Sequence, residues 1–115
     1  MADYILKMII ILGSTGFLGA HLQYEFRKNS IEFITIGRSK ESDIVVDPLD
    51  FNSVKDVVLA YRPEVLINLV AITDVDYCEQ NPKDAMEVHV SIPFLLSNLI
   101  KYHEFKIIHL STDQV

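Results

Sequence analysis

Three glycines near the start of the chain have a spacing that suits the binding of a phosphate group. Gly13, Gly16 and Gly19 come directly after the apolar run at 8–12, which is typical of a buried strand. Apolar residues then recur at helical spacing, so a helix is expected to begin near the last glycine. A strand, a glycine turn and a helix start would present backbone N–H groups and a positive dipole end to a pyrophosphate. The alternative is an ordinary tight turn.

Cationic and hydroxyl side chains follow the next predicted strand, at 33–36. They occupy the segment Gly37-Arg38-Ser39-Lys40, where a binder of the unphosphorylated dinucleotide usually has an acid that holds the ribose 2′-hydroxyl. Arg38 instead offers a guanidinium that can pair with a 2′-phosphate, and Ser39 could assist it. The segment therefore favours NADP(H), with NAD(H) as the alternative. Arg38 could also be a solvated loop cation.

Two carboxylates follow a third short strand, at 44–46. Asp47 could accept the amino protons of an adenine ring, and Asp50 is the better candidate for the cap of the next helix. That helix is predicted from about Ser53 to Tyr61, because Pro63 stops it.

The elements that must position these residues alternate along the chain. Strands are predicted at 8–12, 33–36, 44–46, 65–70 and 106–110, and helical stretches lie between them, one of them with Ser91 as a candidate cap. Continuous apolar strands that alternate with helices predict an α/β fold. The expected architecture is a Rossmann-type doubly wound parallel sheet, covered on both faces, with strand order 3-2-1-4-5. The carboxyl ends of strands 1, 2, 4 and 5 would then meet along one crevice.

Composition limits the classes of protein to which the chain can belong. It has 115 residues, of which 50% are hydrophobic, with 10 Lys plus Arg against 16 Asp plus Glu. The length fits a single domain over residues 1–115, with 1–7 as a loose extension. The hydrophobic fraction argues against a disordered chain. The net charge of −6 argues against a nucleic-acid partner, and the short apolar runs argue against a membrane span. Cys78 is the only cysteine, which favours a reduced cytoplasmic setting.

The histidines and the remaining acids make weak sites. The four histidines have no metal-ligand spacing, and His109 is expected to be a core or crevice residue of the last strand. Cys78 has no neighbouring base and is expected to pack rather than react. The acidic loop around Asp74, Asp76 and Glu79 is expected to be a solvated surface. No metal site is predicted.

Several of these segments resemble a known family. The segment Gly13–Gly19, GSTGFLG, has the glycine spacing of the extended short-chain dehydrogenase/reductases. Within that superfamily, the segments 62–68 and 71–76, together with Glu79, resemble the dTDP-4-dehydrorhamnose reductase group. The ending 109–115, HLSTDQV, is similar to that group's Ser-Thr-Asp signature. The resemblance covers residues 8–115.

The resemblance implies where a dinucleotide would lie. The glycine turn would hold the pyrophosphate, the segment after strand 3 would flank the adenine, and residues 71–73 would line the path to the nicotinamide. The implied cofactor-binding residues are Gly13, Thr15, Gly16, Phe17, Leu18, Gly19, Arg38, Ser39, Asp47, Pro48, Ala71, Ile72 and Thr73.

The resemblance also implies one catalytic residue. Thr112 would correspond to the hydroxyl of the family's Thr/Tyr/Lys set and, with Asp113, would face the sugar substrate. Reduction of a C4 ketone builds negative charge on oxygen, which a neutral hydroxyl donor stabilises. The alternative for Thr112 is a hydroxyl that caps the next segment.

The chain departs from the family pattern in two ways. His89 stands where many extended members have an asparagine. The Tyr-x-x-x-Lys spacing occurs only at Tyr24 and Lys28, on the first helix, and at Tyr102 and Lys106, which lead into the last predicted strand. We therefore expect the cofactor-binding portion of an NADP-preferring sugar-nucleotide reductase that acts on a dTDP-4-dehydro-6-deoxy sugar. This portion would be truncated before the sixth strand and inactive alone.

Two other functions remain open. The regulatory β subunit of methionine adenosyltransferase resembles the same motifs, so a non-catalytic binding protein is one alternative. A nucleotide-sugar epimerase or dehydratase is the other, although Gln114 stands where the dehydratases usually have an acid. The expected partner is a nucleotide sugar, and homodimer formation is left open.

Overall fold

The molecule is built on a parallel sheet. The computed structural model describes residues 8–13, 17–70, 79–86 and 90–110. Within them the sheet has five strands in the order β3-β2-β1-β4-β5, and every neighbouring pair is parallel. The strands are β1 (Ile9–Leu12), β2 (Phe33–Gly37), β3 (Ile44–Val45), β4 (Val65–Asn68) and β5 (Lys106–His109). The predicted fold class and strand order are confirmed.

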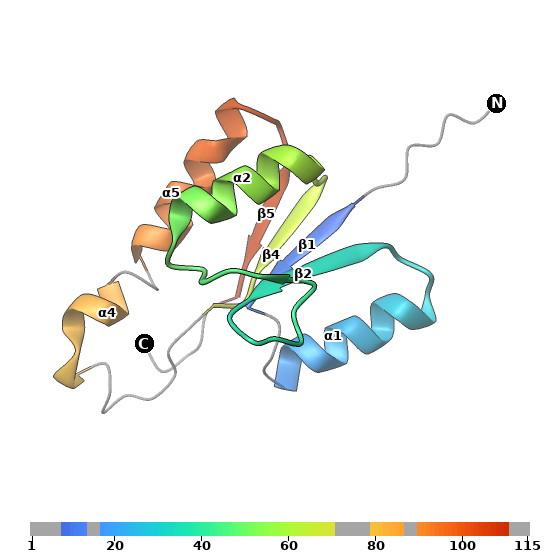
Figure 1. Cartoon of the computed structure of the whole chain (residues 1–115), viewed down its shortest axis with the longest axis horizontal. Coiled ribbons are helices and arrows are strands. Elements are labelled where there is room, and N and C mark those ends of the chain that lie inside the picture. The colour runs from blue at the N-terminus through green and yellow to red at the C-terminus, as the bar shows by residue number, and fades with distance from the viewer. Residues whose placement is uncertain (1–7, 14–16, 71–78, 87–89, 111–115) are drawn as a thin grey trace.

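Helices connect most of these strands along the described part of the chain. They are α1 (Phe17–Lys28), α2 (Phe51–Tyr61), α4 (Pro82–Met86) and α5 (Ile92–Asn98), the last continued by the 3₁₀ turn η2 (Leu99–Lys101). Figure 1 shows α2 and α5 on one side of the strands and α1 on the other. This placement follows from right-handed crossovers between parallel strands.

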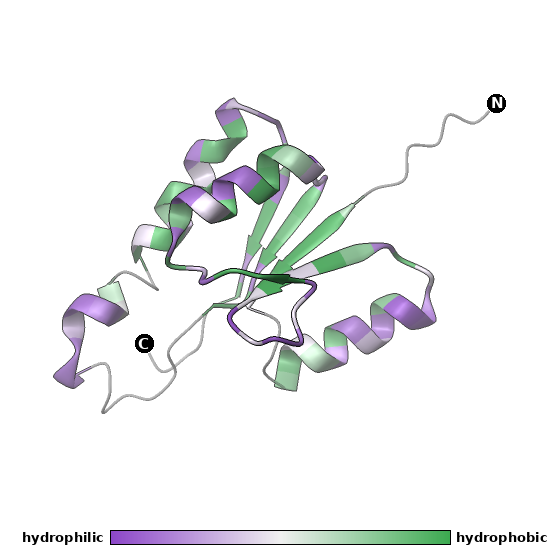
Figure 2. Ribbon diagram, in the orientation of Figure 1, coloured by the Kyte–Doolittle hydropathy of each residue, from purple (hydrophilic) through white to green (hydrophobic). Residues whose placement is uncertain are grey.

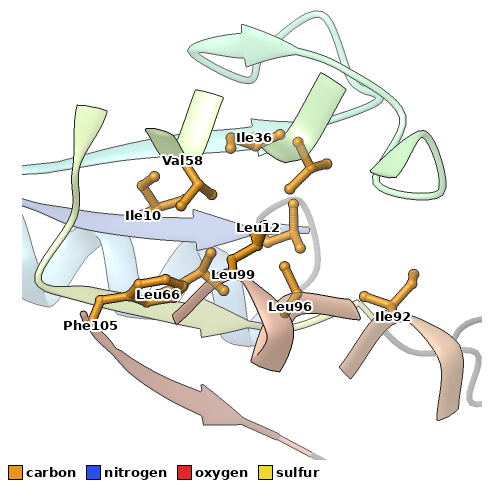
Figure 3. Packing of buried hydrophobic residues seen from close by; sticks show 10 residues of the cluster. Ile10, Leu12, Ile36, Val58, Leu66, Ile92, Leu96, Leu99 and Phe105 are labelled. Carbon is orange, nitrogen blue, oxygen red and sulfur yellow. The ribbon is translucent and has the colours of Figure 1, made fainter. Parts of the chain in front are cut away.

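The main core lies between the sheet and the pair formed by α2 and α5. Ile10, Leu12 and Leu66 point from the central strands toward Val58 and Leu96 on the helices, and all five are fully buried (Figure 3). Strand β1 is apolar along its whole length and β4 is apolar up to its last residue, as Figure 2 shows, because both faces of a central parallel strand are shielded from water. Truncation of such a buried leucine to alanine typically costs about 2–5 kcal/mol of stability.

The opposite face of the sheet is covered unevenly. Residues in register form a row across it, Thr35, Ile11, Ile67 and Ile108. The first three are buried, whereas Ile108 on β5 is 47% exposed. Both faces of β1, β2 and β4 are therefore covered, whereas β5 is covered by α5 on the core side and no described element lies over its opposite face.

The contacts of α1 explain that difference. Of the apolar residues that recur at helical spacing along it, Leu18 is 49% exposed, and Leu22 and Phe26 are half-buried. The Phe26 ring lies 5.7 Å from the Phe33 ring on β2. The helix therefore packs near the β2 side of the sheet and does not extend over β5.

Two predicted helix caps had different outcomes. Asp50 caps α2: its Oδ1 accepts the Ser53 backbone N–H at 3.4 Å, and its Oδ2 accepts the Ser53 hydroxyl at 2.8 Å. Ser91 occupies the predicted N-cap position of α5, but its side chain makes no capping hydrogen bond. Its backbone is already helical, and Pro93 in the first turn has no N–H to be capped.

Candidate functional site

The carboxyl ends of β1, β2, β4 and β5 lie at one edge of the sheet. Backbone hydrogen bonds extend past the strands and hold these ends together: Gly13 N to Ile36 O at 2.8 Å, Leu69 N to Leu12 O at 2.9 Å, and Leu110 N to Asn68 O at 3.2 Å. In open parallel sheets this edge is where ligands bind. The predicted meeting of these strand ends is confirmed.

Gly13 begins the turn after β1, and its position accepts no side chain. Its φ is +81°, in the region that glycine adopts most readily. A Cβ at this position would lie 2.7 Å from Val70 Cγ2 and 3.1 Å from the Val70 backbone nitrogen. The turn can therefore pass close to the end of β4 only because residue 13 is glycine.

The start of α1 provides a surface without negative charge. Phe17 is 90% exposed, Leu18 is 49% exposed, and Gly19 is buried within the helix. The first turn contains no acidic residue, so its free N–H groups have no carboxylate of that turn as a competitor for an anion. Thr15 and Gly16, predicted to contact the same pyrophosphate, lie outside the described residues.

The loop after β2 carries the predicted 2′-phosphate ligands. Arg38 is exposed and has no hydrogen-bond or ion-pair partner among the described residues. Ser39 Oγ accepts the backbone N–H of Glu41 at 3.1 Å, and Ser39 O accepts that of Ser42 at 2.9 Å. Ser39 thus folds the loop with its acceptors, while its hydroxyl hydrogen can still be donated.

Asp47 and Pro48, the predicted adenine neighbours, form a turn that enters α2. Asp47 Oδ1 accepts the Leu49 backbone N–H at 2.9 Å, and its carbonyl accepts that of Asp50 at 2.8 Å. Pro48 is buried and Asp47 is exposed. Of the two acids that could have capped α2, Asp50 does so, and Asp47 holds the turn before it.

A polar contact that was not predicted joins the ends of β4 and β5. Asn68 is only 3% exposed, and its Nδ2 lies 3.2 Å from His109 Nδ1. Its Oδ1 accepts the Val70 backbone N–H at 3.1 Å. Partial burial of the imidazole lowers the pKa of His109 below its usual value. An asparagine at the end of an otherwise apolar strand was the signal that could have revealed this contact.

The expectation that His109 could be a core residue is wrong, because its side chain is exposed on an edge strand with one neighbour in the sheet. The alternative, a position beside the crevice at the carboxyl ends of the strands, stays a prediction. In the described part of the chain, no group of three or more His, Cys, Asp or Glu residues could hold a metal ion. None of the described helices has the length and apolar character that a bilayer crossing requires.

Ten further residues singled out in the sequence lie outside the described residues. They include the residues predicted beside the nicotinamide and those predicted beside the substrate. The ten are Ala71, Ile72, Thr73, Asp74, Asp76, Cys78, His89, Thr112, Asp113 and Gln114.

The sequence as a whole matches one protein family. The model of the family described as "RmlD substrate binding domain" matches residues 7–115. The chain belongs to this family. The match covers every described strand and helix, including the glycine turn and the loop after β2.

Two curated relatives show how the family's members are named. A protein of Haloferax volcanii named "Probable low-salt glycan biosynthesis reductase Agl14" is 31% identical over 110 residues, which are 91% of this chain and 37% of that protein. The bovine "Methionine adenosyltransferase 2 subunit beta" is 26% identical over 111 residues, which are 95% of this chain and 33% of that protein. The chain therefore spans about a third of the length of these relatives.

Solved structures of the family share the fold. A hypothetical dTDP-4-dehydrorhamnose reductase from Sulfolobus tokodaii matches with a TM-score of 0.83 and 30% identity, over 92% of this chain and 39% of that one. The dTDP-4-dehydrorhamnose reductase of Bacillus anthracis, solved in complex with NADP, matches with a TM-score of 0.82 and 23% identity, over 97% and 38%.

Proposed function

We propose that this chain is the cofactor-binding portion of a sugar-nucleotide reductase of the dTDP-4-dehydrorhamnose reductase type. The observation that carries the proposal is Gly13, whose positive φ and contact with Val70 bring the end of β1 against the end of β4. Membership of the family and the reductase names of two solved relatives support it. The preferred dinucleotide is NADP(H), with NAD(H) as the alternative.

The described residues fit this cofactor. The turn at Gly13 and the acid-free first turn of α1 suit the pyrophosphate, and Arg38, which has no partner among the described residues, suits a 2′-phosphate. Asp47 and Pro48 would flank the adenine, and Ser39 would lie at the ribose end. When bound, the reduced dinucleotide supplies the hydride, and this chain's residues bind and orient it.

The same proposal assigns the substrate side to the segment after β5. Thr112 would donate its hydroxyl hydrogen to the substrate oxygen on which negative charge develops, and Asp113 would face the sugar. The hydrogen bond between Asn68 and His109 holds the carboxyl end of β5, from which this segment continues. Ala71, Ile72 and Thr73, which follow β4, would line the path between the two sites.

A second function is supported by the bovine relative. The name of that protein describes a subunit of methionine adenosyltransferase. A non-catalytic regulatory protein with the same dinucleotide site is therefore the second candidate. The two candidates share the cofactor site and differ in turnover.

One experiment separates them. NADPH oxidation is followed in the full-length protein with a dTDP-4-dehydro-6-deoxyhexose, and NADPH affinity is measured by calorimetry in the same preparation. Turnover that depends on the sugar nucleotide supports the reductase. Tight NADPH binding without turnover, together with binding of a methionine adenosyltransferase catalytic subunit, supports the regulatory protein. Failure to bind either NADPH or NADH contradicts both.

A further inference from the structure

The loop between β2 and β3 is closed by a reciprocal contact between Thr35 and Asp43. Asp43 Oδ2 accepts the Thr35 backbone N–H at 2.9 Å and the Thr35 hydroxyl at 3.2 Å. In return, the Asp43 backbone N–H donates to Thr35 Oγ1 at 2.8 Å. These two residues directly precede the register pair Ile36 and Ile44, where the backbone ladder of β2 and β3 begins. Side-chain atoms therefore extend the pairing of the two strands.

The rest of the loop is also held by its own hydrogen bonds. The Ser42 N–H donates to Ser39 O at 2.9 Å, and the Val46 N–H donates to Gly37 O at 3.0 Å. These bonds fold residues 38–42 into a closed loop above the end of β2. In Figure 2 the loop is largely hydrophilic, so apolar packing does little to fix its shape.

Gly37 and Ser42 add a steric constraint at the base of the loop. Ser42 is 8% exposed, and its Oγ has no hydrogen-bond partner among the described residues. A Cβ on Gly37 would lie 2.9 Å from this oxygen. The absence of a side chain at residue 37 thus lets Ser42 turn inward, while Arg38 next to it stays exposed.

We propose that Asp43 is a positioning residue for the recognition of a 2′-phosphate by Arg38, an inference that rests on the proposed function. A guanidinium pairs well with a phosphate only in a defined orientation, and ordering a mobile loop on binding would weaken affinity. Asp43 orders the loop before the ligand arrives. Its Oδ2 is committed to Thr35, and no described residue neutralises Arg38.

The test compares NADPH and NADH affinity by calorimetry in the full-length protein. The wild type should prefer NADPH by roughly tenfold to a hundredfold, and Arg38→Ala should remove the preference. Asp43→Ala should reduce it to within about threefold while the NADH Kd changes less than about twofold. Asp43→Asn keeps an acceptor oxygen and should retain most of the preference. Asp56→Asn, which removes an exposed carboxylate of α2, is the control for net charge and should match the wild type.

A second readout does not depend on the cofactor. Amide hydrogen exchange at Ser42 and Val46 should be faster in Asp43→Ala, because the loop is no longer closed by Thr35. Thr35→Val removes the hydroxyl from the same contact and keeps a β-branched residue in β2. It should reproduce the loss of preference, and it decides the question if Asp43→Ala does not fold.

The outcomes that overturn the proposal are distinct from a failure of the proposed function. If Arg38→Ala removes the preference but Asp43→Ala and Thr35→Val retain it, Asp43 does not position Arg38, and the NADP site stands. An equal loss of NADPH and NADH affinity in Asp43→Ala also overturns the inference, because the residue would then only stabilise the fold. A wild type that binds neither dinucleotide, or both equally, contradicts the proposed cofactor itself.

Discussion

Asn68, the last residue of β4, donates its side-chain amide to Nδ1 of His109, the last residue of β5, across 3.2 Å. The orientation of the amide follows from its other bond, because Oδ1 accepts the Val70 backbone N–H and leaves Nδ2 to face the ring. His109 Nδ1 must therefore be the acceptor, and the neutral ring carries its proton on Nε2. Side chains thus join the two strand ends that the backbone ladder already pairs.

Replacement of Asn68 should destabilise the protein more than replacement of His109. Asn68→Leu leaves the Val70 N–H without its acceptor, which should cost about 1–3 kcal/mol. His109→Ala removes only one bond at an exposed ring and should cost about 0.5–1.5 kcal/mol. Urea unfolding of both single variants and the double variant measures the coupling between them. Strictly additive losses of unfolding free energy would show that the hydrogen bond between Asn68 and His109 contributes nothing to stability.

The protein should become less stable as the pH is lowered through the range where His109 titrates. Because the folded pKa lies below 6.5, the unfolded chain binds more protons between these two values. The free energy of unfolding therefore has its full value, with respect to His109, above about pH 6.5, and it decreases as the pH falls through the folded pKa. Protonation also places a hydrogen on Nδ1, which faces the Asn68 amide. Urea unfolding from about pH 7.5 to about pH 5 should show a steeper loss for the wild type than for His109→Gln. Equal slopes would contradict this assignment.

Gly13→Ala should be among the most damaging small substitutions in the site. The positive φ and the contact with Val70 both oppose a side chain, and together they should cost about 2–5 kcal/mol. Val70→Ala in the same chain removes the clash with Cγ2 and should recover part of the loss. Full recovery would show that the backbone conformation carries no penalty, since the Val70 nitrogen and the φ angle are unchanged. Thermal melts of the two single variants and the double variant measure these effects.

Thr112→Val should lower kcat much more than it weakens NADPH binding, if the hydroxyl acts as proposed. Loss of one donor to a developing oxyanion typically costs about 2.7–4 kcal/mol, which is on the order of a hundredfold to a thousandfold in rate. Thr112→Ser keeps the hydroxyl and should retain most of the activity. Steady-state kinetics and thermal melts of the full-length variants are the measurements. Normal turnover with a lowered Tm in Thr112→Val would assign a capping role instead.

The exposed side of β5 should make the 115-residue chain self-associate. Ile108 on the edge strand β5 is 47% exposed and Leu110, which follows the strand, is 40% exposed. Exposed apolar edges favour association. Sedimentation at concentrations on the order of tens of micromolar should show species larger than a monomer. Ile108→Lys should reduce them, whereas Tyr24→Lys, at another exposed apolar residue on α1, should not. A monodisperse wild-type monomer would refute this expectation.

The sequence predicted the sheet well because its strands are continuous apolar runs. The run at 106–110 predicted β5, and the acid at residue 50 predicted a helix cap, since both signals are local. The exposure of Ile108 could not be predicted in this way, because it depends on whether another element covers β5. The contacts of Asp43 with Thr35 and of Asn68 with His109 were also missed. Each joins residues of two paired strands or their flanks, eight and 41 residues apart, that become neighbours only through strand register.

The central place of β1 has a consequence for the folding of the chain. β1 pairs with β2 on one side and with β4 on the other, so Ile9 is in register with both Phe33 and Val65. During synthesis, the first pairing becomes available long before the second, because α2 and β4 must still emerge. Until then, one side of β1 has unpaired backbone groups and its isoleucines lack the cover of α2. Non-local pairing of this kind slows folding, so the nascent chain has an interval of vulnerability to intermolecular strand pairing or chaperone capture.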